Sequence, residues 1–400
     1  MNKQKTVIVV GGGPAGLMAA WKLATHFEVH LFEKEKMLGQ KFLLAGKGGF
    51  NLTNKLSGSE LFPKYLPGGF LDNALAAFDS LAFREWLQLL GIPTFEGSSG
   101  RVFPEKGITP AQVLKKITDS LFSRGVHINL KHKLVSFNPG MDFCFSYTEG
   151  EMIIKADYAL LALGGASWPS TGSDGKWVNI FSKNNINTLD FEPSNCGLNI
   201  SWPDAVKLFH TGKPLKNISI SINDKVSRGE ALITEYGLEG NAVYPVVPQI
   251  RYSLKSGDNP IICLDFKPTL SYEQLILRIL GKPVKPNNYS RLFGLNPPTL
   301  AIIKAFTDKE TFLNPASFAE SIKQISIPVT SLRPVEEAIS SVGGLDLAEV
   351  NPDFSLKKFP ELFAIGEMLD WDAPTGGFLL QGCFSMGNYA AQQILNRENL

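Results

Sequence analysis

The residues best suited to bind a charged cofactor stand at the start of the chain. An apolar, β-branched run at residues 6–10 predicts a buried strand, and three glycines and a helix-forming stretch follow it. Glycines in this spacing let the backbone approach a pyrophosphate, which then lies at the positive end of the helix. The segment predicts a site for the ADP half of a dinucleotide. Its predicted binding residues are Gly11, Gly13, Pro14, Ala15 and Gly16.

An acidic residue follows the glycines at the expected distance. Glu33 ends a second predicted strand, residues 28–32, and lies 22 positions after Gly11, close to the spacing of about 20 for an acid that holds a ribose hydroxyl. A carboxylate there disfavours a 2′-phosphate, so the site favours the adenosine of FAD or NAD over that of NADP. Lys34 follows directly and joins the predicted cofactor residues.

Residues 34–54 favour FAD over NAD. A nicotinamide-binding domain would continue with another strand and helix, whereas this segment is rich in glycine, amides and hydroxyls. Such side chains and free backbone N–H groups supply directional hydrogen bonds to a diphosphate and a flavin ring. The predicted cofactor residues here are Lys41, Gly46, Gly48, Asn51, Thr53 and Asn54.

These motifs resemble the YhiN/BaiN-like bacterial flavoproteins, a family of FAD-dependent oxidoreductases that includes aminoacetone oxidase. The family signature G-x-K-x-x-x-(S/A)-G-x-G-x-x-N-x-(T/S)-N corresponds to residues 39–54. Phe50 stands where many members carry Cys, so no redox cysteine is expected at that position. The resemblance implies a glutathione-reductase-type FAD domain and extends to two later segments.

The second segment follows a predicted strand at residues 155–163, and the third precedes the last predicted helix, residues 378–395. A helix that begins after Gly-Gly presents free N–H groups with partial positive charge, here expected to face N1 and O2 of the flavin. In the family's layout, backbone groups near Val135 hold the adenine edge, and Asp370 lies on the ribityl or pyrophosphate side. The cofactor residues implied by these segments are Val135, Gly164, Gly165, Thr171, Gly172, Gly366, Glu367, Asp370, Thr375, Gly376, Gly377 and Phe378.

No acid, base or nucleophile stands out for the chemical step. The candidate catalytic residues are Lys41, Arg101, Tyr236 and Trp371, with Asn51, Glu235 and Gln381 as further candidates for the pocket. All five histidines lie outside the three segments, and we expect no metal site. The predicted function is hydride transfer to or from flavin N5 on a small organic substrate, with NAD(P)H as one source of electrons. Two alternatives stay open: an amine oxidase that uses dioxygen, and a flavin-binding sensor without turnover.

These segments require a discontinuous domain. We predict an α/β fold in which residues 1–189 and 334–400 form a Rossmann-like FAD-binding domain. Residues 190–333 are predicted to be an insertion with a β-rich module and a small helical module, because prolines and short alternating strands dominate there. Single helices are expected at residues 71–91 and 109–125, and a single strand at residues 126–134.

Composition narrows the partners and the location. The formal net charge of +1, with no basic cluster, argues against nucleic acid as a partner. No apolar run approaches the roughly 20 residues of a membrane span. The four cysteines are widely spaced, which is typical of reduced structural thiols. We therefore expect a cytoplasmic protein that acts on a small molecule.

Overall fold

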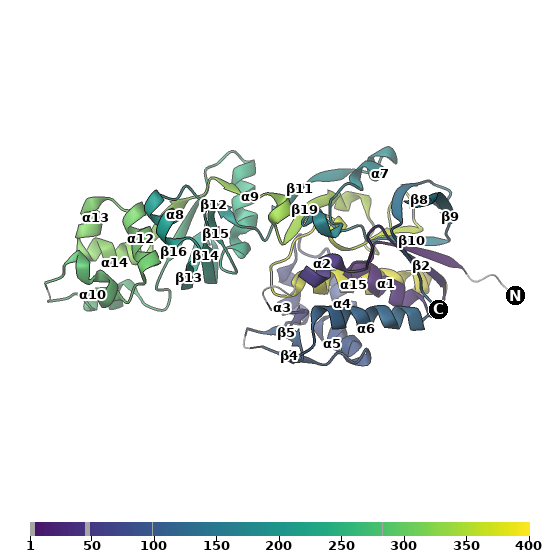
Figure 1. Ribbon diagram of the computed structural model, residues 1–400, viewed down its shortest axis with the longest axis horizontal. Helices are drawn as coiled ribbons and strands as arrows, with labels where there is room; N and C mark the ends of the chain where they lie inside the picture. The colour runs from purple at the N-terminus through teal and green to yellow at the C-terminus, as the bar shows by residue number, and fades with distance from the viewer. Residues whose placement is uncertain (1–4, 45–48, 98, 282) are drawn as a thin grey trace. The chain divides into compact units, whose positions relative to one another are not determined.

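The computed structural model of the chain (Figure 1) describes residues 5–44, 49–97, 99–281 and 283–400. The chain divides into two compact units. Met1–Glu192 and Ser340–Leu400 form the first unit, and Pro193–Ile339 form the second. The first unit thus joins the two ends of the chain.

A parallel sheet is the centre of the first unit, with the strand order β20-β10-β1-β2-β6. The strands are β1 (Thr6–Val10), β2 (Glu28–Glu33), β6 (His127–Leu130), β10 (Tyr158–Leu161) and β20 (Leu362–Ala364). β1 is almost wholly apolar and buried, as expected for a strand covered on both faces. Parallel strands place their carboxyl ends at one edge of the sheet, so residues that follow β1, β2 and β10 converge there.

Helices cover one face of this sheet and a meander covers the other (Figure 1). The helices are α1 (Pro14–Leu23), α6 (Pro110–Ser123) and α15 (Phe378–Arg397). The meander consists of β7 (Lys133–Phe137), β8 (Asp142–Tyr147) and β9 (Gly150–Lys155). α1 packs closely on α15, where a Cβ on Gly387 would lie 2.3 Å from the Ala15 carbonyl oxygen. On the opposite face, Phe32 stacks on Phe145 with ring centroids 4.0 Å apart.

Two predicted elements are each divided in two. The single strand expected at residues 126–134 is wrong: β6 joins the parallel sheet and β7 joins the meander, because Lys131 adopts a left-handed turn with φ 59°. The single helix expected at residues 71–91 is also wrong. It divides into α4 (Asp72–Ala77) and α5 (Ser80–Leu89), because the Asp79 carboxylate accepts hydrogen bonds from the N–H groups of Leu81 and Ala82 and starts a new helix.

Smaller elements complete the first unit, and one of them, β11, ends two residues beyond it. They are α2 (Gln40–Leu44), β3 (Thr53–Asn54), α3 (Gly58–Leu61), β4 (Thr94–Glu96), β5 (Arg101–Pro104), α7 (Val178–Lys183), β11 (Thr188–Ser194), β19 (Ser340–Leu345) and the 3-10 turn η8 (Gly366–Met368). β3, β5 and β4 form an antiparallel sheet, and β11 pairs with β19.

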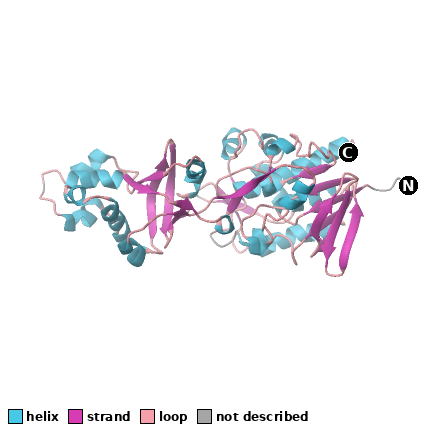
Figure 2. Cartoon of the chain, turned by 90° about the horizontal axis from the view of Figure 1, so that it is seen from above, coloured by secondary structure: helices cyan, strands magenta, loops and turns pink. Residues whose placement is uncertain are grey.

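The second unit holds an antiparallel sheet with its own core (Figure 2). Its strands, in the order β17-β16-β13-β14-β15-β12-β18, are Ile325–Pro328, Ile261–Asp265, Pro214–Ile222, Lys225–Ile233, Gly237–Glu239, Leu198–Asn199 and Ser331–Leu332. Its helices are α8 (Asp204–His210), α9 (Val247–Lys255), α10 (Tyr272–Leu277), α11 (Tyr289–Phe293), α12 (Pro297–Phe306), α13 (Lys309–Leu313) and α14 (Pro315–Lys323). Aromatic rings join part of the helical group, with Tyr289 stacked on Phe318 at 3.9 Å. The predicted fold class, a Rossmann-like α/β domain with a β-rich and a helical module, is confirmed.

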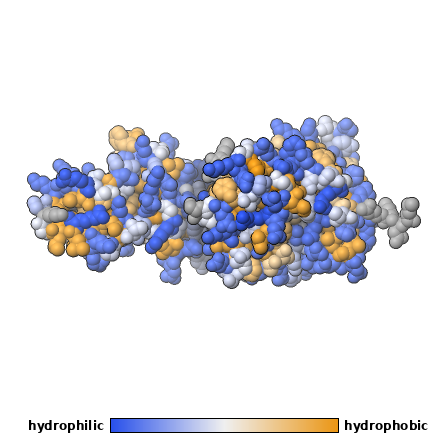
Figure 3. All heavy atoms as spheres, turned by 90° about the horizontal axis from the view of Figure 1, so that it is seen from below, coloured by the Kyte–Doolittle hydropathy of each residue, from blue (hydrophilic) through white to orange (hydrophobic). Residues whose placement is uncertain are grey.

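Among the described residues, no helix combines the length and the apolar character that crossing a bilayer requires. Figure 3 shows hydrophilic residues over much of the face in view, with apolar groups scattered between them.

Candidate functional site

The glycine turn after β1 begins the site. Gly11 donates its N–H to the Phe32 carbonyl at 2.8 Å, which ties the turn to the end of β2. A Cβ on Gly16 would lie only 2.0 Å from the Gly11 carbonyl oxygen, so this glycine lets α1 pack against the turn. Gly13 differs, because a Cβ there would meet no atom within 4 Å. Gly13 caps α1 without a side-chain hydrogen bond, and the first N–H groups of a helix have no partner within it.

Glu33 lies beside this turn at the end of β2. One carboxylate oxygen accepts a hydrogen bond from the Gly12 N–H at 2.7 Å, and the other accepts from the Glu35 N–H at 2.9 Å. Burial raises the pKa of Glu33, while these two N–H groups act in the opposite direction. Each carboxylate oxygen keeps a lone pair for a further donor such as a ribose hydroxyl.

A cavity of about 370 Å³ extends from these residues. The glycine turn, the ends of β2 and β10, α2, the meander, residues 171–174, α7, the Gly366–Glu367 turn and Cys383 of α15 contribute to its lining. Burial raises the pKa of the Cys383 thiol to about 12, and the charge of Glu367 adds to this shift, so the thiol is protonated at neutral pH. The volume of the cavity suits a ligand pocket.

At the meander, a β-bulge frees backbone groups at the cavity. The pairing of β7 with β8 shifts register between Leu134 and Ser136, which leaves Val135 as the extra residue. A bulged residue is unpaired in the ladder, and Val135 lines the cavity. The His132 ring, which also lines the cavity, stacks on Tyr147 with centroids 4.9 Å apart. The backbone of a bulged residue in this lining is suited to an adenine edge.

Residues 171–174 form a turn held against the end of β2. Lys34 Nζ pairs with the Asp174 carboxylate at 2.9 Å, and both residues line the cavity. Burial raises the pKa of Asp174, but hydrogen bonds from Lys34 and the Lys176 N–H outweigh it and leave this pKa below its ordinary value. Ser173 also lines the cavity, and its buried hydroxyl has no hydrogen-bond partner among the described residues.

This unpaired hydroxyl tests the fit of the site to a cofactor. Leaving a buried polar group unpaired costs about 1–3 kcal/mol, and Ser173 faces the same cavity as the open space at Gly13 and the bulge at Val135. A phosphate, a hydroxyl or a ring nitrogen of a dinucleotide would pair with such groups. The donor set therefore fits FAD.

Lys41 and Glu367 form a second charged pair at the cavity. Lys41 Nζ donates to both carboxylate oxygens of Glu367, at 2.6 and 2.9 Å, and to Ser167 Oγ at 2.6 Å. The side chains of Lys41 and Glu367 are 27% and 14% exposed, so the pair is largely shielded from water. Glu367 also accepts from the Ser341 N–H at 3.1 Å, which fixes the position of the pair.

The predicted cofactor residues fall into separate groups in the structure. Those lining the cavity are Gly11, Gly13, Pro14, Ala15, Glu33, Lys34, Lys41, Val135, Gly164, Thr171, Gly172, Gly366 and Glu367. Among the described residues, the lining does not include Gly16, Asn51, Thr53, Asn54, Gly165, Asp370, Thr375, Gly376, Gly377 or Phe378. Gly46 and Gly48 lie outside the described residues.

Several of these other residues gather at the start of α15. Thr53 donates its hydroxyl to Gln381 Oε1 at 2.6 Å, and a Cβ on Gly377 would lie 2.5 Å from the Thr53 backbone. β3 and β5 pair Asn54 with Arg101, and a Cβ on Gly376 would lie 3.7 Å from Arg101 Nε. The start of α15 is therefore bordered by the Thr53 hydroxyl and the Arg101 guanidinium.

Asp370 and Trp371 have structural partners. The Asp370 carboxylate accepts a hydrogen bond from the Gly343 N–H at 2.7 Å. Trp371 is buried, donates its indole N–H to the Gly366 carbonyl at 2.9 Å and packs against Tyr65. These contacts hold the turns that lead to α15.

Tyr236 belongs to the second unit. Its hydroxyl donates to Glu239, and the Arg333 guanidinium lies 4.2 Å from its ring centroid. Burial and the hydrogen bond to Glu239 raise the pKa of Tyr236, so the phenol is protonated at neutral pH. This candidate is therefore part of a local cluster of charged and aromatic groups.

Sequence reasoning missed several residues of the cavity lining. Gly12, His132, Trp177 and Cys383 line the cavity but were not predicted to bind the cofactor. Ser173 also lines the cavity, and it belongs to the turn with Thr171 and Gly172 that the family resemblance places near the flavin. Trp177, whose indole N–H donates to the Gly164 carbonyl at 2.9 Å, gave no such signal.

Comparison with known proteins agrees with this architecture. A 3-dehydro-bile acid delta(4,6)-reductase of Clostridium scindens is 24% identical over 407 residues, 97% of this chain and 98% of that protein. A ribosomal RNA dihydrouridine synthase of Escherichia coli is 22% identical over 414 residues, 97% of each chain. A crystal structure of 3-ketosteroid-delta4-(5alpha)-dehydrogenase from Rhodococcus jostii, at 15% identity and a TM-score of 0.51, covers 98% of this chain and 97% of its own, and shows a shared fold.

The fold and the cavity define a dinucleotide-binding protein of the Rossmann type. The sequence profile of the HI0933-like protein Rossmann domain matches residues 5–393. The chain therefore belongs to the HI0933-like family, which confirms the predicted YhiN/BaiN-like family. The family, the fold and the donor set of the cavity assign FAD to this chain as its cofactor. They assign the chain to the flavin-dependent oxidoreductases.

Proposed function

We propose that this enzyme binds FAD in the cavity of the first unit and reduces a carbon–carbon double bond of an organic substrate. The observation that carries the proposal is the cavity itself, where open space at Gly13, the acid Glu33, the unpaired Ser173 hydroxyl and the Lys41–Glu367 pair meet. Bound FAD supplies a centre that accepts a hydride and passes it on at N5.

The residues around the cavity have distinct proposed roles. The N–H groups that follow Gly13 hold the pyrophosphate at the positive end of α1. Glu33 accepts hydrogen bonds from the ribose, and the backbone of Val135 holds the adenine edge. Ser173 donates its hydroxyl to the cofactor. Lys41 is held in place by its ion pair with Glu367 and is the proposed proton-holding group of the site.

The names of the two relatives support reduction as the direction. Both denote the addition of hydrogen to a carbon–carbon double bond, in a bile acid for one and in uridine for the other. Such a reduction needs a hydride on one carbon and a proton on the other, with the two electrons supplied here by NAD(P)H. A double bond conjugated with a carbonyl is the proposed substrate class, because the carbonyl accepts the negative charge that develops after hydride transfer.

Anaerobic mixing tests this proposal. The purified yellow protein is mixed with NADH, NADPH or an amine, and the flavin absorbance is followed. Bleaching by NAD(P)H, followed by recovery on addition of 2-cyclohexenone or a steroid enone under nitrogen, is the expected result. Bleaching by the amine, with recovery only on admission of dioxygen, would select the amine oxidase. No bleaching with any donor would favour the sensor.

A uridine-containing RNA is a second substrate to include, because of the relative that forms dihydrouridine in ribosomal RNA. If RNA rather than the enone restores the absorbance, the substrate is a pyrimidine ring. The Gly13→Val variant, from which we expect FAD to be lost, is the matched control in each assay.

A further inference from the structure

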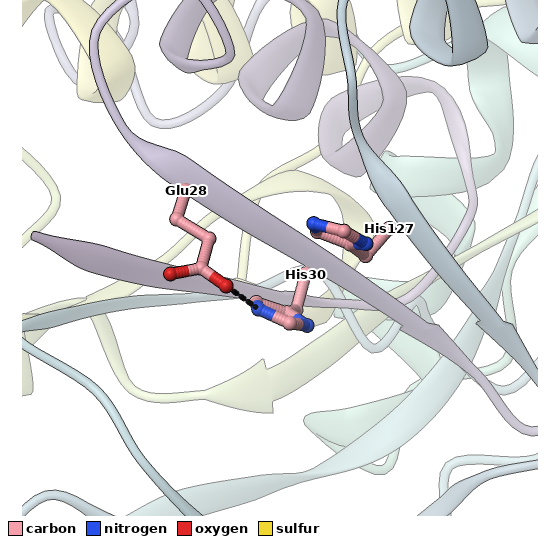
Figure 4. A group of neighbouring side chains, drawn as sticks. All are labelled: Glu28, His30 and His127. Atoms are coloured by element: carbon pink, nitrogen blue, oxygen red, sulfur yellow. Dashed lines mark hydrogen bonds and ion pairs between the residues drawn. The ribbon is translucent and has the colours of Figure 1, made fainter. Parts of the chain in front are cut away.

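Three side chains with metal-ligating atoms meet at one edge of the parallel sheet (Figure 4). Glu28 and His30 are two residues apart on β2, so their side chains point to the same face. His127 is the register partner of His30 on β6, the last strand in the sheet order. Figure 4 shows the Glu28 carboxylate directed at the His30 imidazole, with the His127 ring beside it.

The distances suit a small ion. A His nitrogen or a carboxylate oxygen from each residue lies within 4.8 Å of the other two. Glu28 Oε1 and His30 Nε2 are 3.1 Å apart, and two ligands of a tetrahedral zinc ion are roughly 3.3 Å apart when each bond is about 2.0–2.1 Å. This pair is therefore already near the separation that an ion would impose.

His127 needs only a small movement to complete the set. Its ring stacks on that of His30, with centroids 4.7 Å apart and an angle of 19° between the planes. Closing the longest separation to that of bound ligands takes a shift of at most about 1.5 Å. His127 is exposed, so a rotation of its side chain makes this shift without disturbing the core.

We propose that Glu28, His30 and His127 bind a divalent transition-metal ion of the zinc, cobalt or nickel type. Two imidazoles and one carboxylate favour these ions over magnesium and calcium, which prefer oxygen ligands. Three protein ligands leave one position of a tetrahedral ion for water. These residues are separate from those lining the cofactor cavity, so the proposal does not depend on the proposed function.

Binding there would fasten the edge strand β6 to β2. β2 continues to Glu33, three residues beyond His30, and β6 leads into His132; both Glu33 and His132 line the cavity. An ion that binds the folded chain raises its stability. We therefore expect metal binding to raise the melting temperature.

Isothermal titration with ZnCl₂ tests the site on the full chain with its flavin, free of any affinity tag and pretreated with EDTA that is then removed. We expect one ion per chain with micromolar affinity, at least tenfold weaker affinity in His127→Ala, and a zinc-dependent rise in melting temperature that EDTA reverses. His26→Ala is the matched control, because His26 is an exposed histidine of the same unit outside the cluster.

A second variant keeps a ligand at the same position. His127→Cys offers a thiolate, so this variant should retain zinc binding. When Co²⁺ is bound instead, its absorption spectrum should show a sulfur-to-metal charge-transfer band. The melting temperature of each variant without metal checks that it folds. Absence of stoichiometric zinc binding to the unaltered chain would overturn the proposal, and so would equal affinities in the unaltered chain, His127→Ala and His30→Ala.

Discussion

Replacing Gly13 with valine is expected to remove FAD and leave the protein folded. Gly13 has φ −82° and ψ −179°, an extended conformation that any residue adopts. A Cβ there meets no atom within 4 Å, and the residue lines the cavity at the start of α1. The valine methyl groups would therefore occupy the space that the proposed pyrophosphate needs.

The size of the effect follows from the interactions that a displaced phosphate loses. One hydrogen bond to a charged group contributes about 1.5–3 kcal/mol, and the helix terminus adds about 0.3–1 kcal/mol. A total of about 2–4 kcal/mol corresponds to a roughly 30- to 1,000-fold higher Kd for FAD. The free energy of unfolding of the apoprotein should change by no more than about 0.5 kcal/mol, because no packed neighbour is disturbed.

The assay measures the ratio of flavin to protein absorbance after gel filtration, the Kd by quenching of flavin fluorescence, and the melting temperature of the apoprotein. Gly68→Val is the matched control, since Gly68 is exposed, lies outside the cavity lining, and a Cβ there also meets nothing within 4 Å. Gly16→Val would not serve, because its Cβ would lie 2.0 Å from a carbonyl oxygen and loss of FAD could then follow from misfolding. A Gly13→Val protein that keeps FAD with unchanged Kd would refute the placement of the pyrophosphate.

Four further predictions concern the same cavity. Ser173→Ala should stabilise the apoprotein or leave it unchanged, because an unpaired buried hydroxyl is removed, and should weaken FAD binding about fivefold; unchanged FAD affinity in a titration would contradict this. Burial raises the pKa of Glu33 above its ordinary 4.5, so the apoprotein should lose stability as the pH rises from that value through the raised pKa. Urea unfolding across this range should show the loss in the unaltered apoprotein and not in Glu33→Gln; identical profiles would count against it. Lys41→Met should destabilise the protein by about 2 kcal/mol, because it leaves a shielded carboxylate unpaired. The double variant Lys41→Met/Glu367→Gln should be destabilised by less. Additive effects in a double-mutant cycle would show that the pair is not coupled. The Cys383 thiol has its pKa raised to about 12, so iodoacetamide at pH 8 should leave it unmodified until the protein is unfolded, and mass spectrometry would expose early labelling.

The part of the cavity proposed to hold adenosine could be predicted from the sequence because its signals are local. The turn at Gly11 and Gly13 directly follows β1, and Glu33 is the last residue of β2, which pairs with β1. The sequence of such a motif determines the local geometry of the site, since the strand, the turn and the helix are consecutive. The family resemblance added Val135, and the structure gives a physical reason for that choice in the bulge between β7 and β8.

The rest of the lining depends on contacts between distant segments. Lys41 pairs with Glu367, which lies 326 positions away in the sequence. Neither residue belongs to a sequence motif from which this pairing could be predicted. Trp371 was a candidate for the pocket, and in the structure it is buried and packs against Tyr65. Local sequence does not distinguish an indole that faces a ligand from one that fills a core.

The histidine pair illustrates the same limit. His30 and His127 are 97 positions apart, and no spacing rule for metal ligands spans such a distance. Their meeting depends on β6 pairing in parallel with β2 in one register, because a shift by one residue would turn His127 to the other face. The prediction of a single strand over residues 126–134 hid this pairing, since it did not divide the residues that join the parallel sheet from those that join the meander. A motif of consecutive residues thus predicts a site that one turn can build, whereas a site built by strand register becomes visible only once the order of the sheet is known.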